Sequence, residues 1–577
     1  MFASWIVRQP DPAQFDDLCA AGHDPLIARL LALRGLGDPG SAQQFLTPQL
    51  RDLPDPHRMA DCEAAAALLV QAVHDGWSIC IYGDYDVDGI SAAALLHDVL
   101  SMAGARPQVF LPDRMRDGYG LRMERLHELA DAGAQLFISA DCGSTAVAEV
   151  AAMRDRDRAF IICDHHALGP ELPPATCHLN PRRPQCQYPD KNLCAVGVAF
   201  VLAQAFRRAA VLAGLCPVEA IDLRGVMELA ALGTIADVVE LKHVNRTLAW
   251  HGLRALGAST RPGLRALVRH LPVGGIDAQR IGFVVGPKIN AAGRVAEPRT
   301  AFDVLTVRDA DTAELLALQL DVENNRRKAL TETMVAEALV LAQESPMAGA
   351  VVVGQHGWHP GVVGIVAARL VEAFHMPAFA LAVDDTGTAR GSGRSVPGYD
   401  LVGALRDAGA DLLQRFGGHA FAAGITLPGD AIDALRQRLS DHAAERLGAN
   451  PAPRTLEVDA ELSPAECDLT LLDRLEKLEP FGRGNEAPRF LLRNVEIRDL
   501  REVGKSGGWG QASLHVRGAG NAWWARPSVK AFGAWRLWQG RGNGDPVDVV
   551  CKLQRNSHRG AVSVQAAVDL VAPATCQ

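Results

Sequence analysis

The sequence predicts a multidomain α/β protein with two α/β lobes, a long helix that joins them, and a small β-barrel after the second lobe. Three observations predict it. Apolar strands alternate with amphipathic helices over about 75–170 and again over about 350–445, a helical pattern runs over 312–343, and short glycine-rich segments of alternating polarity follow 455. The length of 577 residues also exceeds what one hydrophobic core normally supports.

Residues 1–60 are expected to form an N-terminal helical segment. They are rich in proline, and one helical pattern spans 25–46. Gly35, Gly37 and Gly40 satisfy the dinucleotide-binding pattern GxGxxG, but a helix precedes them where that fingerprint requires a strand. We therefore interpret these glycines as a turn between two helices.

The first α/β lobe is assigned to 61–305 and is predicted to contain a parallel, doubly wound sheet. Its strand-like segments "SICIYG", "QLFISA" and "AFIIC" are separated by amphipathic helices. The joining helix is assigned to 306–345 and the second α/β lobe to 346–448. The proline-bearing stretch "ANPAPRT", 449–455, separates this lobe from a β-barrel predicted for 455–577.

Composition and charge are those of an ordinary globular enzyme, with 48% hydrophobic and 22% charged residues. The net charge of −9 argues against a surface coated uniformly with nucleic-acid-binding charge, although a local basic patch is compatible with it. The N-terminus does not show the pattern of a secretory signal, in which basic residues precede an apolar run. No stretch approaches the roughly 18 uninterrupted apolar residues of a membrane span. Cys177, Cys186 and Cys194 lack zinc-ligand spacing, which indicates reduced thiols. We expect a cytoplasmic protein without a membrane segment.

The stretch "IYGDYDVDGISAA", 81–93, places three aspartates directly after an apolar strand. Asp84, Asp86 and Asp88 repel one another, so their crowding suggests that a cation lies among them. An isolated DxD more often marks a plain turn with solvated carboxylates. A calcium-binding EF-hand loop is disfavoured because its twelfth position is Leu95 instead of glutamate.

Two further strands carry polar side chains at their carboxyl ends. Asp141 follows "LFISA", and Asp164, His165 and His166 follow "AFIIC". Neighbouring parallel strands bring their carboxyl ends to one crevice, where such folds bind ligands. Carboxylates with one or two imidazoles favour Mn²⁺ or Mg²⁺ over zinc, and a shared aspartate can bridge two such ions. Packed histidines with a supporting role are the alternative.

The C-terminal region is basic and rich in tryptophan. Residues 482–569 contain 14 Lys or Arg and 7 Asp or Glu, which gives a net charge of +7. Base stacking on aromatic rings beside a basic groove is the usual mode of single-strand binding by OB-type barrels, whereas burial in the barrel core is the alternative for each ring. Five of the nine tryptophans lie here, namely Trp509, Trp523, Trp524, Trp535 and Trp538.

Several long motifs resemble those of the DHH phosphoesterase superfamily in order and spacing. They are "DYDVDG", "DCG" at 141–143, "DHH" at 164–166 and "LGTIADVV" at 232–239. Two more, "SGRS" at 392–395 and "FGGHAFAAG" at 416–424, are similar to the associated DHHA1 domain. The resemblance narrows to bacterial 5′-to-3′ single-strand-specific DNA exonucleases through "FLPDRMRDGYG" at 110–120, "GPKINAAGR" at 286–294 and "EPFGRGNEAPRF" at 479–490. It covers nearly the whole chain.

The resemblance implies metal-dependent degradation of single-stranded DNA to mononucleotides in DNA repair and recombination, with two Mn²⁺ or Mg²⁺ ions. Asp86 and a shared Asp141 would hold the second ion, with Asp84 as a weaker candidate. Tyr82 stands where pyrophosphatase-type relatives carry a metal-binding histidine, so this ion is expected to bind weakly until nucleic acid arrives. His166 would lie nearer the substrate. The first ion would be held by Asp88, Asp141, His165 and Asp237, the last of which enters through the resemblance alone.

The resemblance also implies a pocket for the 5′ end. Guanidinium groups match phosphate oxygens, and glycines in "NAAGR" and "SGRS" permit close backbone approach, although a solvated surface charge is the alternative for each arginine. The pocket would consist of Arg114, Arg294, Ser392 and Arg394, with His419 near the scissile nucleotide. Single-stranded DNA is the implied partner, delivered by a helicase or a single-strand-binding protein, and a monomer would suffice.

Two other functions stay open at this point. A superfamily relative acting on short oligonucleotides or small phosphate esters would not require the basic, tryptophan-rich tail. A nonenzymatic DNA-binding scaffold would be expected to lose acids from "DYDVDG" or "DHH", and both motifs are intact.

Overall fold

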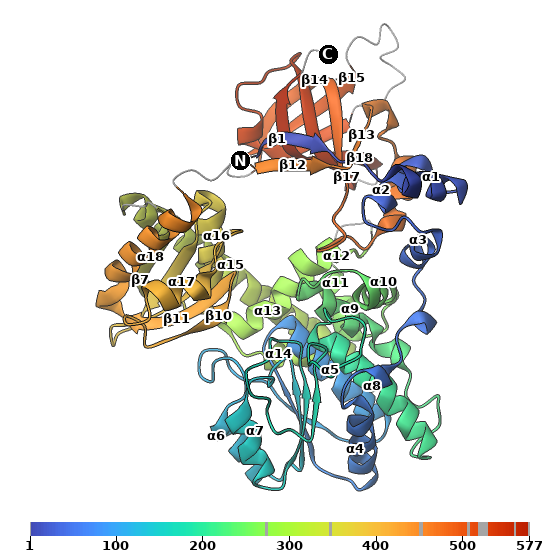
Figure 1. Ribbon diagram of the computed structural model, residues 1–577, viewed down its shortest axis with the longest axis vertical. Coiled ribbons are helices and arrows are strands. Elements are labelled where there is room, and N and C mark those ends of the chain that lie inside the picture. The colour runs from blue at the N-terminus through green and yellow to red at the C-terminus, as the bar shows by residue number, and fades with distance from the viewer. Residues whose placement is uncertain are drawn as a thin grey trace.

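The computed structural model describes residues 2–269, 271, 275–345, 349–448, 454–504, 508–516, 529–558 and 561–574. Figure 1 shows two α/β lobes, side by side at the lower right and the left, and a β-barrel above the first of them. The predicted fold class is confirmed: two α/β lobes, a long connecting helix and a closed barrel.

The first lobe is built on a parallel five-stranded sheet in the order β3-β2-β4-β5-β6. The strands align so that Gly83, Ala140, Cys163 and Leu179 form one row across the sheet. Because four strands, β2, β4, β5 and β6, end together at this row, the residues that follow them meet at one edge. The strands are β2 (Ile79–Gly83), β3 (Gln108–Phe110), β4 (Leu136–Ala140), β5 (Ala159–Cys163) and β6 (Cys177–Leu179).

Helices cover both faces of this sheet, which explains why its strands are almost wholly apolar. Ile79 and Ile81 point into the larger core, whereas Cys80 and Tyr82 point into the smaller one on the opposite face. On the larger face lie α4 (Cys62–His74), α5 (Val87–Met102), α8 (Ala195–Leu212), α9 (Met227–Ala236) and α10 (His243–Gly257). The smaller face is covered by α6 (Met123–Asp131) and α7 (Val147–Arg154).

Among the described residues, α8 alone is long and apolar enough to span a membrane by length and composition. Most of it is buried within the lobe, with 67% of the tested window inside the protein. It is therefore a core helix of the first lobe in this structure.

One long helix, α15 (Ala310–Glu344), connects the two lobes and contains the predicted stretch 312–343. Its first half contributes Ala317 and Leu320 to the core of the first lobe, and its second half contributes Met334 and Ala338 to the second. Shorter elements precede it: α11 (Pro262–Val268), α12 (Ala278–Arg280), a π-helical turn η4 (Ile281–Val285), α13 (Gly286–Val295) and α14 (Arg299–Thr306).

The second lobe has a mixed five-stranded sheet in the order β10-β11-β9-β8-β7, in which only β7 and β8 are parallel. Its strands are β7 (Val351–His356), β8 (Ala378–Val383), β9 (Thr388–Arg394), β10 (Arg415–His419) and β11 (Ala422–Pro428). Three helices pack on it, namely α16 (Val363–Phe374), α17 (Leu401–Ala408) and α18 (Ile432–Leu447).

The C-terminal sheet closes on itself because β14 pairs with both β15 and β17. This five-stranded closure is the OB-type barrel that the sequence predicts. Its strands are β14 (Arg489–Val503), β15 (Trp509–Val516), β16 (Val529–Ala534), β17 (Pro546–His558) and β18 (Ala561–Pro573), with β13 (Ala460–Glu461) and α19 (Leu469–Leu475) beside them.

The N-terminal segment packs on this barrel and contains a strand in addition to the predicted helices. Its first element, β1 (Phe2–Val7), pairs in parallel with β12 (Arg454–Val458). The helices α1 (Pro12–Ala20), α2 (Pro25–Ala32) and α3 (Pro39–Leu46) follow, and side chains from α1 and α2 share one core with α19 and the barrel. The glycines at 35, 37 and 40 lie between α2 and α3 or at the start of α3, so the interpretation as a turn between helices is confirmed.

Candidate metal and phosphate site

Three acidic residues continue the row of strand ends in the first lobe. The backbone N–H groups of Asp84, Asp141 and Asp164 each donate to a carbonyl of the neighbouring strand at 3.0 Å. These bonds extend the sheet by one residue beyond the last paired row. The three side chains therefore start from one line at the carboxyl edge, as the sequence predicts.

The N-terminus of α5 brings two further carboxylates to this edge. Asp86 is its N-cap and accepts a hydrogen bond from the Gly89 N–H at 3.0 Å. Asp88 accepts from the N–H groups of Ala195 and Val196 at 2.6 and 2.9 Å, at the first turn of α8. A helix N-terminus stabilises a carboxylate, so α8 fixes Asp88 in its buried position.

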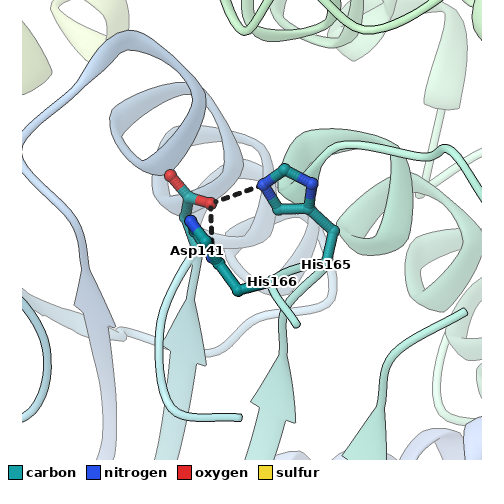
Figure 2. Close-up of side chains that lie close together, drawn as sticks. All are labelled: Asp141, His165 and His166. Atoms are coloured by element: carbon teal, nitrogen blue, oxygen red, sulfur yellow. Dashed lines mark ion pairs between the residues drawn. The ribbon is translucent and has the colours of Figure 1, made fainter. Parts of the chain in front are cut away.

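His165 lies at the centre of the cluster. Its Nε2 is 3.2 Å from Asp141 Oδ1, 3.8 Å from Asp237 Oδ2 and 3.9 Å from Asp88 Oδ2. Figure 2 shows the Asp141 carboxylate facing the rings of His165 and His166, whose nearest nitrogens are 3.2 and 3.7 Å from Oδ1. Asp237, which the residue pattern alone did not single out, ends α9 and reaches the same point.

The possible ligand atoms form overlapping groups, each with its members within 4.8 Å of one another. One group consists of Asp88, His165 and Asp237, and another of Asp84, Asp86 and Asp141. Asp141 also groups with His165 and His166. The first group contains three of the four ligands that the resemblance implies for the first ion, and the second contains the three implied for the second ion. The division between two ions stays a prediction.

Burial and mutual repulsion oppose ionisation of four of these carboxyl groups, namely Asp84, Asp88, Asp141 and Asp237. Burial, with the charges of neighbouring aspartates, raises the pKa of Asp88 to about 7 and that of Asp237 to about 8. The same causes raise the pKa of Asp84 and Asp141 well above its ordinary range. A divalent cation would remove the repulsion, because it favours the ionised form of every carboxylate near it.

Unsatisfied polar atoms point to the same conclusion. Within the described residues, Asp84 Oδ1, Asp141 Oδ1 and His165 Nε2 are buried without a hydrogen-bond partner. Burying polar atoms in this way is costly unless a ligand satisfies them. The oxygen-rich donor set with one imidazole therefore fits Mn²⁺ or Mg²⁺.

The two histidines have opposite protonation tendencies. Burial and the adjacent His166 lower the pKa of His165 to about 4, which keeps its imidazole neutral and able to coordinate a metal. Burial also opposes the charged form of His166, but a hydrogen bond between its Nδ1 and Asp164 at 2.8 Å, with the charges of that aspartate and its neighbours, raises its pKa to about 9. Asp164 is held in turn by the Ser144 N–H at 2.9 Å.

Tyr119 belongs to this site, although only its motif was noted in the sequence. Its hydroxyl lies 3.2 Å from the His166 ring nitrogens and donates to the Asp141 carbonyl at 3.3 Å. The ring is half exposed. The aromatic residue in "RDGYG" was the available signal. Tyr82 is instead buried in the core of the sheet, with its ring beside Phe110.

The predicted arginine pocket lies where α13 and the second lobe meet the aspartate loop. Arg294 follows Gly293, whose lack of a side chain lets α13 approach the loop: an added Cβ would lie 2.6 Å from the Tyr85 carbonyl oxygen. Arg294 donates to the Gly361 carbonyl at 3.2 Å. Arg114 lies over the Tyr85 ring, with its guanidinium carbon 5.1 Å from the ring centre.

Ser392 and Arg394 complete this pocket from β9. Arg394 donates to the Ser392 hydroxyl at 2.9 Å, and both side chains lie against Gly364 at the start of α16. An added Cβ on Gly364 would lie only 3.0 Å from the Arg394 guanidinium. The glycine therefore leaves room for the guanidinium and for an anion beside it.

A further arginine, Arg327 of α15, joins the pocket and was missed in the sequence, where it lies in a long charged helix. Burial and the charges of Arg114, Arg327 and Arg394 lower the pKa of Arg294 to about 10. None of these four guanidinium groups forms an ion pair with a carboxylate in the part of the chain that the structure describes. Neighbouring guanidinium groups without a carboxylate partner favour an anion such as phosphate, so the predicted role in binding the 5′ end stays a prediction.

His419 lies apart from these contacts. It ends β10 in an exposed hairpin with β11, and its side chain forms no hydrogen bond or ion pair with the other described residues. Its predicted place near the scissile nucleotide stays a prediction.

The barrel offers fewer exposed tryptophans than their number in the sequence suggests. Trp538 is fully buried in the core, whereas Trp509 is 51% exposed and stacks on Phe532 at a ring separation of 5.5 Å. Trp535 is partly buried against the same core. Trp523 and Trp524 lie outside the described residues.

Part of the basic charge of this region is also paired. Among the described residues between 482 and 569, four arginines form ion pairs with carboxylates, and three of those carboxylates, Glu461, Asp473 and Glu476, lie outside the stretch. They are Arg489, Arg493, Arg498 and Arg555. The net charge of the stretch therefore overstates the positive charge that the barrel presents to a ligand.

The parallel sheet, its edge of carboxylates and the neighbouring arginines from both lobes define a metal-dependent phosphoesterase of the DHH class. The family model described as DHH family, N-terminal domain, matches 78–234, and the DHHA1 domain matches 345–445. A third model, the RecJ OB domain, matches 458–569. The chain belongs to the RecJ family, whose curated members are named single-stranded-DNA-specific exonucleases.

Relatives in this family are similar over most of the chain. The Bacillus subtilis member is 36% identical over 87% of this chain and 63% of its own length, so the chain spans less than two thirds of that relative. The Haemophilus influenzae member is 30% identical over 96% of this chain and 97% of its own length. The crystal structure of RecJ from Thermus thermophilus in complex with Mn²⁺ has a TM-score of 0.83 at 31% identity, covering 99% of this chain and 80% of that one.

Proposed function

We propose that this chain degrades single-stranded DNA from its 5′ end to mononucleotides in a reaction that depends on Mn²⁺ or Mg²⁺. The proposal depends on one observation: the carboxylate cluster and the arginines lie beside the same loop. The carboxylate cluster and the arginine pocket meet at the loop 84–88, because Arg114 and the α13 segment before Arg294 both contact Tyr85. A terminal phosphate in the pocket would leave the first linkage beside the carboxylates.

Asp88, Asp141, His165 and Asp237 would hold one ion, and Asp84 and Asp86 with Asp141 would hold the second. Bound there, such ions lower the pKa of water and neutralise charge that develops on the phosphate. The α8 N-terminus and the extended sheet ladder keep these side chains in place before substrate arrives. That preorganisation supports catalysis because the carboxylates do not have to move.

The other residues of the site would bind and orient the strand. Arg294, Arg394 and Ser392 would donate hydrogen bonds to the 5′-phosphate, and this sets the polarity of degradation. His166, whose Nδ1 is bound to Asp164 and whose ring nitrogens both lie beside the Tyr119 hydroxyl, would lie next to the substrate at this edge of the cluster. The barrel would hold bases further along the strand, with Trp509 as the exposed stacking surface. A monomer contains all of these parts.

The test is the hydrolysis of a single-stranded oligonucleotide labelled at its 5′ end and, in parallel, at its 3′ end, with Mn²⁺ or with EDTA. Immediate release of a 5′-labelled mononucleotide, with a 3′-labelled ladder that EDTA abolishes, is expected. Intact long strands, together with hydrolysis of dinucleotides or bisphosphates, would replace the proposal with a small-ester activity. Duplex DNA with blunt ends serves as the control and is expected to stay intact.

A further inference from the structure

Arg246 of α10 is a fully buried arginine without a carboxylate partner among the described residues. Its Nε donates to the Phe45 carbonyl and a terminal nitrogen donates to the Glu479 carbonyl, both at 2.8 Å. The guanidinium carbon lies 3.6 Å from the centre of the Phe45 ring. Burying a charge that contacts only carbonyl groups and an aromatic ring lowers the stability of the folded chain. The location of these three partners therefore indicates the role of Arg246.

Those partners belong to the N-terminal segment and the barrel region, whereas Arg246 belongs to the first lobe. Phe45 belongs to α3 of the N-terminal segment, and Glu479 precedes the barrel strands. Arg246 itself belongs to the first lobe, nine positions after Asp237 of the carboxylate cluster. The arginine therefore joins the barrel, together with the helices packed on it, to the lobe that carries the metal site.

Neighbouring contacts extend this junction between the barrel side and the first lobe. On the barrel side it consists of Phe45, Pro48 and 479–485. On the side of the first lobe it consists of Leu241, Arg246 and His251. The Leu241 N–H donates to the Arg483 carbonyl at 2.8 Å, and His251 Nε2 lies 3.0 Å from the Pro48 carbonyl oxygen. Gly482 is packed on Leu241, since an added Cβ would lie 2.7 Å from its side chain. The motif "EPFGRGNE", which the catalytic site does not use, thus forms one side of the junction.

We propose that Arg246 is a positioning residue that fixes the barrel at one distance from the metal ligands, so that a long strand is held at both places at once. This inference rests on the proposed function. Two sites held at a fixed spacing bind one strand more tightly than two loosely linked sites, because the second contact is made at high effective concentration. A strand too short to reach the barrel gains nothing from the junction.

The test compares Arg246→Met with a matched control, Arg224→Met, which removes an exposed arginine of the same lobe whose ion pair within the described residues is with Asp222. Substrates are 5′-phosphorylated oligothymidylates of two and thirty nucleotides with Mn²⁺. For Arg246→Met we expect KM for the long strand to rise roughly tenfold with kcat unchanged, and both constants for the dinucleotide to stay as in the wild type. Arg246→Lys, which can still donate to a carbonyl, is expected to recover part of the loss.

Small-angle scattering and binding measured without turnover provide independent readouts. The radius of gyration of Arg246→Met is expected to rise, and its affinity for the long strand in EDTA to fall by a similar factor. If Arg246→Met does not fold, Gly482→Val breaks the same junction from the barrel side. Unchanged long-strand affinity in a folded junction variant, or an equal loss on the dinucleotide, would overturn the inference. A wild type that binds the long strand but cleaves neither substrate would instead refute the proposed function.

Discussion

Replacing Arg294 by methionine is predicted to weaken catalysis while stabilising the free protein. Burial and three nearby guanidinium groups lower the pKa of Arg294 to about 10, which corresponds to about 3 kcal/mol that the folded chain loses by keeping this charge. Methionine removes the charge but also the hydrogen bond that the charged guanidinium donates to Gly361 at 3.2 Å, worth about 1.5 kcal/mol. The free variant is therefore expected to be more stable by about 1.5 kcal/mol, which gives a rise of a few degrees in its first thermal transition.

The catalytic loss follows from the same geometry. A charge-assisted hydrogen bond to phosphate contributes about 1.5–3 kcal/mol, so kcat/KM for a 5′-phosphorylated strand is expected to fall roughly 10- to 100-fold. A strand with a 5′-hydroxyl lacks the phosphate and is expected to change much less. The assay is initial-rate hydrolysis of the two strands, with thermal unfolding in phosphate-free buffer. Arg390→Met, on the exposed part of β9, is the control. An equal fall on both strands, or a lower unfolding temperature, would refute the reasoning.

The remaining predictions concern the metal ligands, the barrel and the junction. Asp88→Asn is expected to lower hydrolysis more than about 100-fold and to weaken Mn²⁺ binding in an electron paramagnetic resonance titration, while strand binding in EDTA persists. Trp538→Ala is expected to cost about 3–5 kcal/mol of barrel stability, seen by thermal unfolding. Trp509→Ala should leave that transition nearly unchanged and instead lower the affinity for a long strand, measured by fluorescence anisotropy, by about 1–3 kcal/mol. Burial and nearby acids raise the pKa of Glu479 to about 7, so its contribution to the stability of the folded chain is full at acidic pH and is lost as pH rises through 7. Glu479→Gln should remove this pH-dependent loss. A difference in stability between the variant and the wild type that stays flat between pH 5 and 8 would contradict the prediction.

Much of the metal site could be predicted because it depends on local patterns. Asp84, Asp141 and Asp164 each follow an apolar strand, and parallel pairing places such positions at one edge whatever the rest of the chain does. The arginine pocket could not be predicted from local patterns alone, because its members come from both lobes and from α15. Arg327 was missed because a charge in a long helix has the same appearance in sequence whether it faces solvent or a pocket.

The N-terminal strand and the buried tryptophan show where local patterns fail. β1 pairs with a strand about 450 residues later, and nothing within a short window of sequence records such a partner. Trp538 lies in the barrel core because Gly510 leaves room for its indole, with an added Cβ at 2.1 Å from the ring. The fold class was nevertheless predictable, because alternation with periods of two and 3.6 residues distinguishes strands from helices without any knowledge of their partners.

The shared core of the first and last parts of the chain has a consequence for synthesis. Leu18, Leu30 and Leu31 share a core with residues such as Leu471 and Leu475, which leave the ribosome some 440 residues later. At about 5–20 residues per second, the apolar faces of α1 and α2 stay uncovered for roughly 20–90 s while both lobes are made and fold. During this interval the N-terminal segment lacks the C-terminal part of its core, and a chain interrupted before the barrel would lack it permanently.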